Sequence, residues 1–95
     1  VLTVEQIKGI CAKVFEEYGV EYGYLFGSYA KGKATERSDV DLLVAMPTNG
    51  LKFFGLVEAL REGLNKKVDV LDIGQLNNNI ALTQEILKDG IKIYG

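Results

Sequence analysis

The spacing of apolar residues along this chain changes repeatedly between the period of a helix and the period of a strand. Residues 3–18 carry apolar side chains at helical spacing up to Gly19, and residues 20–26 then alternate as a strand does, with Gly23 as an expected bulge. Alternating helices and strands favour an α/β (α+β) structure in which helices flank a small sheet. The predicted elements, in order, are a helix over residues 3–18, a strand over 20–26, one helical turn over 29–31, a strand over 40–44, a helix with an apolar face over 53–64, a strand over 67–73, a helix over 80–88 and an edge strand over 91–94.

Polar residues and glycines mark where these elements begin and end. Thr3 and Gln6 have the spacing of a capping box at the start of the first helix. Ser28 is expected to cap the short helical turn, which Gly32 closes. Pro47–Gly50 predicts a turn after the second strand. The boundaries follow one another without a linker between domains.

The size and composition of the chain favour one globular domain. Ninety-five residues are enough for a modest core, so we expect residues 1–95 to form a single domain. Val1 is not an initiator methionine, so we expect at least one residue before it. No apolar run is long enough for a membrane span, no signal peptide is apparent, and the only cysteine, Cys11, has no disulfide partner in the chain. These features favour a cytoplasmic protein that does not enter a membrane.

The charged and titratable residues exclude several classes of function. The chain contains no histidine, which excludes Ser-His catalysis and histidine metal sites within it. A net charge of −2 gives no basic surface of the kind that binds nucleic acid strongly. Neither a dinucleotide-binding glycine motif nor a P-loop follows the first strand. Any catalysis must therefore use carboxylates.

Three aspartates lie where they can form one acidic site. Asp39 and Asp41 are two residues apart at the start of a strand, so their side chains share one face. Asp69 joins them if its strand lies beside theirs. Two carboxylates about 4–5 Å apart repel by roughly 3–4 kcal/mol at an effective dielectric constant near 20, which a bound cation would offset. We therefore predict that these three aspartates bind Mg²⁺ or Mn²⁺, with Asp72 as the alternative third ligand.

The corner after the first strand has the features of a phosphate site. Gly27 lets a phosphate approach the backbone closely, and Ser28 offers a hydroxyl beside the first amides of the short helix. An amide-lined corner opposite a metal-bound triphosphate suits phosphoryl or nucleotidyl transfer by in-line displacement. The other candidates are polar or cationic residues that follow the corner: Lys31, Lys33, Arg37 and Ser38.

Each feature alone is also typical of ordinary structure. A Gly-Ser pair commonly forms a turn, an Asp-x-Asp pair is commonly a solvated edge, and Asp69 could lie on an exposed face. Ser38 has the position of a turn residue before a strand. Phe53 and Phe54 are expected in the core, although one of them could be exposed. The combination and spacing of these features favour a functional site.

Together the corner and the aspartates resemble a known signature. Gly27-Ser28, ten further residues and then Asp39-Val40-Asp41 resemble the nucleotidyltransferases related to DNA polymerase β, and in particular the minimal nucleotidyltransferases of prokaryotes. The segments KKVDVLD and EILKDGIKIYG extend the resemblance along most of the chain. The resemblance implies a palm-like fold with a small mixed sheet, in which the first two aspartates hold the metals.

The same resemblance implies roles for the remaining site residues. Asp69 would be the third carboxylate and general base, and Gly27 and Ser28 would bind the triphosphate of ATP. Many members read Gly-Ser-Arg-Ala-Arg-Gly at the corner, whereas this chain has Tyr29 and Lys31 at the two arginine positions. A lysine is a point charge and not a bidentate fork, so phosphate binding here differs in detail.

The resemblance also implies an acceptor and a partner. Such proteins commonly transfer AMP from ATP to a tyrosine of a helical HEPN toxin and act as its antitoxin. The elements predicted here leave no second domain to present an acceptor, so we expect another chain to complete the site. Two alternatives remain open: an antitoxin or binding subunit that acts by contact alone, and a homodimeric nucleotidyltransferase that modifies a small molecule.

Overall fold

A four-stranded mixed sheet forms the centre of the computed structural model, which describes residues 1–47, 50–76 and 78–95. The strand order is β3-β2-β1-β4. Strand β2 pairs antiparallel with β1 and parallel with β3, and β4 pairs antiparallel with β1. The strands are β1 (Tyr22–Phe26), β2 (Val40–Ala45), β3 (Val68–Asp72) and β4 (Ile91–Tyr94). The predicted small mixed sheet and its C-terminal edge strand are confirmed.

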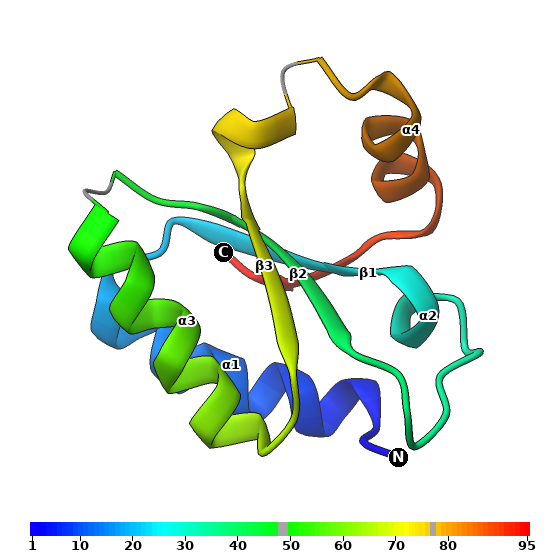
Figure 1. The fold of residues 1–95 in the computed structure, drawn as a ribbon, viewed down its shortest axis with the longest axis horizontal. Coiled ribbons are helices and arrows are strands. Elements are labelled where there is room, and N and C mark those ends of the chain that lie inside the picture. Colours follow the sequence, from blue (N-terminus) through cyan, green and yellow to red (C-terminus); the bar gives the residue numbers. More distant parts are fainter. Residues whose placement is uncertain (48–49, 77) are drawn as a thin grey trace.

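Helices cover the two faces of the sheet unequally (Figure 1). Helices α1 (Val4–Tyr18) and α3 (Gly50–Leu64) pack together on one face. Helix α4 (Ile80–Asp89) and the 3₁₀ helix η1 (Ile73–Leu76) lie on the other face. The short helix α2 (Gly27–Ala30) follows β1 directly. Within the described ranges, no helix combines the length and the apolar character that crossing a membrane would require.

Strand β2 divides its side chains between two cores. Val40, Leu42 and Val44 are fully buried against the face that α1 and α3 cover. Leu43 belongs to a smaller core with Ile86 of α4. Because side chains alternate along a strand, residue 41 shares the more open face with Leu43. The first residues of β2 therefore lie beside the small core, where helices cover less of the sheet.

The predicted element boundaries hold in several places. The Thr3 side chain accepts a hydrogen bond from the Gln6 amide, and the Gln6 side chain accepts one from the Thr3 amide, which confirms the capping box. The pairing of β1 with β4 shifts between Gly23 and Tyr24, which confirms the bulge. The Pro47–Gly50 turn falls partly on residues 48–49, outside the described residues.

One local prediction is wrong. Ser28 is not the cap of the short helix, because α2 already begins at Gly27, with Phe26 at the capping position. The backbone of Gly27 bends sharply enough for the helix to start one residue early. In α3 the buried residues are Leu56, Leu60 and Leu64, whereas Phe54 is 63% exposed. Phe53 packs against the larger core, so the expectation that one of these two phenylalanines could be exposed is confirmed.

We expect a side chain at position 23 to destabilise the fold. A Cβ on Gly23 would lie 2.6 Å from Cε2 of Phe15, which is fully buried and has little room to move. Gly23→Ala should reduce the free energy of unfolding by about 1–3 kcal/mol through overpacking. Urea denaturation measures this change.

Gly9→Ala is the matched control for that substitution. A Cβ on Gly9 meets no atom within 4 Å, and the residue is exposed within α1. Alanine there should stabilise the protein by about 0.5–1 kcal/mol through helix propensity. Equal effects of the two substitutions would contradict the packing assigned to Gly23.

Candidate functional site

Two predicted carboxylates face each other across β2 and β3. The parallel register places Asp41 directly opposite Asp69. Asp39 lies just before β2 begins. An open groove of about 450 Å³ runs beside the pair. Its lining comes from three strands and from α3: Phe26, Asp41, Val57, Arg61, Val68, Asp69, Val70 and Leu71. The predicted acidic site required these two strands to be neighbours in the sheet, and they are.

The carboxylates of the site repel one another. Burial raises the pKa of the Asp41 carboxyl to about 6. The negative charges of Asp69, Asp39 and Glu85 act on this pKa in the same direction. Each makes the charged form of Asp41 less favourable in the folded protein. The acidic cluster is thus an environment that a cation would stabilise.

The donor atoms of this cluster fit a hard divalent cation, but they are not gathered around one point. Carboxylate oxygens are the ligands that Mg²⁺ and Mn²⁺ prefer. Among the residues that the structure describes, no three His, Cys, Asp or Glu side chains are arranged to hold an ion together. An Oδ2 atom of Asp39 instead lies 3.8 Å from the Lys67 ammonium. Metal binding by Asp39, Asp41 and Asp69 therefore stays a prediction.

Asp72 has a different role from the three acidic candidates. Alternation along β3 places it on the opposite face from Asp69. Its Oδ2 accepts a hydrogen bond from the Gly74 amide at 3.0 Å, and its own amide donates to Gln75 Oε1 at 2.8 Å. These contacts fix the start of η1. The structure therefore favours Asp69 over Asp72 as the third carboxylate.

The glycine corner lies directly against Asp41. Phe26 lies opposite Asp41 in the pairing of β1 with β2, so Gly27 follows at the same end of the sheet. Gly27 has φ +73°, and a Cβ there would lie 3.0 Å from Asp41 Cγ and closer still to its Oδ2. Glycine is thus required by the backbone and by Asp41. A larger residue at position 27 would disturb the fold as well as any phosphate site.

The residues after the corner take part in local contacts. The Lys33 amide donates to the Ser28 carbonyl oxygen at 2.9 Å, which closes the turn after α2. Lys31 donates through Nζ to Glu85 Oε1 of α4 at 2.8 Å. Gly32 has φ +71°, and its amide donates to the Tyr29 carbonyl oxygen, as predicted for the residue that ends the turn. The ammonium of Lys31 lies on the α4 side of the corner.

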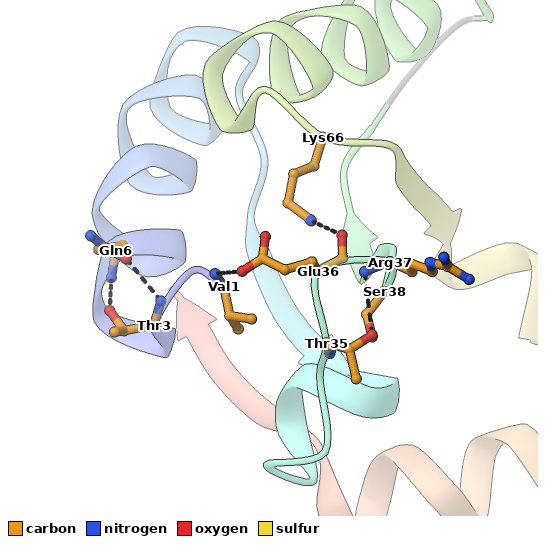
Figure 2. Close-up of polar contacts among 8 residues, drawn as sticks. All are labelled: Val1, Thr3, Gln6, Thr35, Glu36, Arg37, Ser38 and Lys66. Atoms are coloured by element: carbon orange, nitrogen blue, oxygen red, sulfur yellow. Dashed lines mark hydrogen bonds and ion pairs between the residues drawn. The ribbon is translucent and has the colours of Figure 1, made fainter.

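Figure 2 shows the loop that leads into β2. Ser38 Oγ accepts a hydrogen bond from the Thr35 amide at 2.8 Å, and the Arg37 amide donates to Thr35 Oγ1 at 3.2 Å. The Lys66 ammonium donates to the Glu36 carbonyl oxygen at 3.2 Å. In this structure Ser38 is the turn residue that its sequence position indicated. The loop is held to the connection before β3, which positions Asp39 near the acidic pair.

Two charged residues near the site gave no signal in the sequence. Arg61 of α3 lines the groove beside Asp41 and Asp69. Glu85 of α4 contacts Lys31 and acts electrostatically on Asp41. Both occupy ordinary surface positions on helices, and only the packing of those helices brings them to the site.

Asp41→Asn should stabilise the cation-free protein at alkaline pH. The pKa of Asp41 is raised to about 6 in the folded state. The free energy of unfolding is therefore highest below the pKa that this carboxyl has in the unfolded state, and it falls as pH rises through 6. Asparagine removes this loss. Melting temperatures in a chelator should therefore favour the variant at pH 8 and differ much less at pH 4.

Glu62→Gln, an exposed carboxylate on α3, is the control and should show no such pH-dependent difference. A destabilisation by Asp41→Asn that is equal at both pH values would contradict the repulsion described here.

Comparison with known sequences places this geometry in a family. The model described as "Polymerase beta, Nucleotidyltransferase" matches residues 5–95. The protein adenylyltransferase MntA of Thermococcus cleftensis is 39% identical over an alignment of 88 residues, and the alignment covers 86% of this chain and 89% of that protein. The match to the family model includes the glycine corner and all three aspartates.

Solved structures share the fold. A structure described as that of a minimal nucleotidyltransferase aligns with a TM-score of 0.78 and 28% identity over 95% of each chain. A chain in the structure of a tri-AMPylated Shewanella oneidensis HEPN toxin in complex with MNT antitoxin aligns with a TM-score of 0.71 and 21% identity. That alignment covers 96% of this chain and 71% of the other, and it supports the fold alone. The fold predicted from the resemblance is confirmed, and the chain belongs to the polymerase β family of nucleotidyltransferases.

Proposed function

We propose that this chain transfers AMP from ATP to a hydroxyl group of a partner protein, namely a tyrosine of a helical HEPN toxin, and so acts as an antitoxin. The observation that carries the proposal is the direct pairing of Asp41 with Asp69 beside the Gly27 corner. The adenylyltransferase activity named for the Thermococcus relative supports the choice of AMP, and the AMPylated HEPN toxin described in the Shewanella complex motivates the choice of such a toxin as acceptor.

Asp39, Asp41 and Asp69 are the residues that would hold a divalent cation, Mg²⁺ or Mn²⁺. When bound, such an ion supplies positive charge that neutralises phosphate oxygens and helps to position the triphosphate. Burial, together with the neighbouring charges of Asp69 and Asp39, raises the pKa of Asp41, and a bound cation would offset both effects. The oxygen-only donor set also suits these two metals.

The other residues would bind the nucleotide and move a proton. Gly27 and Ser28, together with Lys31 and Ser38, would contact the triphosphate. Asp69 is exposed on the open face, so an acceptor hydroxyl could reach its carboxylate and pass it a proton. The acceptor oxygen must approach the α-phosphorus from the side opposite the leaving pyrophosphate.

The acceptor would come from a second chain. We propose that residues 1–95 form one minimal nucleotidyltransferase domain. Within it, the described helices pack against the sheet. The groove beside Asp69 is open, so a partner segment could enter it. This arrangement suits a partner protein as acceptor.

Transfer of AMP should be visible by radiolabelling. The chain is incubated with Mg²⁺, a helical protein encoded beside it and ATP labelled at the α-phosphorus. Label should appear in the partner and should be absent when the γ-phosphorus carries it, because pyrophosphate leaves. Asp41→Asn should reduce labelling by about 100-fold or more, a typical loss when a group that stabilises developing charge is removed.

Glu62→Gln should label the partner as the unchanged protein does. A partner that is neutralised without label by both the unchanged protein and Asp39→Ala/Asp41→Ala would instead establish an antitoxin that acts by contact. Label found only in small molecules would establish the homodimeric alternative.

A nucleotide and a metal should also stabilise the folded protein together. AMP-PNP with Mg²⁺ at 100 times its dissociation constant should add about 2.7 kcal/mol to the free energy of unfolding, because the ligand binds only the folded state. Asp41→Asn should abolish this gain while remaining folded. Thermal denaturation with and without ligand measures it, and an undiminished gain in the variant would contradict the metal site.

A further inference from the structure

An ion pair joins the phosphate corner to α4. Lys31 follows α2, and its Nζ lies 2.8 Å from Glu85 Oε1. The side chains are 33% and 35% exposed, so the pair is partly shielded from water. It connects residues 54 positions apart in the chain. This contact is a tertiary one and not a local feature of either helix.

Glu85 influences both halves of the candidate site. It raises the pKa of Lys31 through the hydrogen bond and through its charge, and Asp89, one turn further along α4, acts on Lys31 in the same direction. Glu85 also contributes to the raised pKa of Asp41. One carboxylate of α4 is therefore close to the cation of the corner and within electrostatic range of the acidic pair.

The ion pair and a triphosphate would use the same ammonium group. Phosphate oxygens that contact Lys31 must share Nζ with Glu85 or displace it. A partly exposed ion pair contributes only about 0–1 kcal/mol, so a triphosphate can displace it.

We infer that Glu85 is a positioning residue that sets the nucleotide affinity of the site by holding Lys31 in the nucleotide-free protein. The inference rests on the proposed function, because it requires Lys31 to contact the triphosphate. It adds a residue of α4 that the family signature does not include. Removing the charge of Glu85 releases Lys31 and strengthens nucleotide binding.

The test is a double-mutant cycle on the dissociation constant of AMP-PNP with Mg²⁺, measured by calorimetry. Glu85→Gln should bind AMP-PNP about threefold more tightly than the unchanged protein, in proportion to a partly exposed ion pair. In a Lys31→Met background the same substitution should change the dissociation constant by much less, because the residue through which Glu85 acts is absent. If Glu85 had a purely structural role, the effect of Glu85→Gln on the dissociation constant would not depend on Lys31.

Asp89→Asn is the matched control, since it removes a neighbouring charge on the same helix without removing the hydrogen bond to Lys31. Its effect should be smaller than that of Glu85→Gln. Three results would each overturn the inference while leaving the proposed function intact. They are an unchanged dissociation constant in Glu85→Gln, an equal decrease of this constant with and without Lys31, and equal effects of Glu85→Gln and Asp89→Asn. Failure of the unchanged protein to bind AMP-PNP would overturn the proposed function itself, and with it the inference.

Discussion

The parallel pairing of β2 with β3 is the interaction on which the rest of the structure depends. In one register it places Val40 opposite Val68 in the core and Asp41 opposite Asp69 on the open face. A shift of one residue would turn the carboxylates toward the helices and the valines toward water. The buried side chains therefore fix a register that the acidic side chains alone would oppose. Folding and the candidate chemistry use opposite faces of the same two strands.

The energetic balance between these faces explains why the acidic cluster is tolerated. Repulsion between neighbouring carboxylates is a few kcal/mol, a substantial part of the about 5–15 kcal/mol that holds a domain folded. Full burial of one aliphatic side chain contributes about 1.5–3 kcal/mol in the other direction. Val40, Leu42 and Val44 supply three such side chains on β2 alone. Gly27 adds a geometric condition, because only a residue without a side chain fits beside Asp41.

Much of this arrangement could be predicted from the sequence because it depends on simple periods. The placement of Asp69 beside Asp41 depended on the two strands being neighbours, and β2 and β3 do pair. The cap assigned to Ser28 was wrong because residue preferences do not reveal a positive φ at Gly27. Which of Phe53 and Phe54 is exposed could not be predicted, because both are equally apolar and only tertiary packing decides. The place of a surface carboxylate such as Glu85 depends on where its helix lies, and no local pattern records that.

The unequal cover of the sheet has a consequence for motion. Helices α1 and α3 each bury three side chains, whereas α4 buries only Ile86. Local opening of α4 should therefore require less free energy than opening of α1 or α3, and its amide hydrogens should exchange with solvent earlier. Each such opening would carry Glu85 away from Lys31. The ammonium of Lys31 would then alternate between paired and unpaired states as this weakly anchored helix detaches, at a lower free energy than unfolding of the sheet requires.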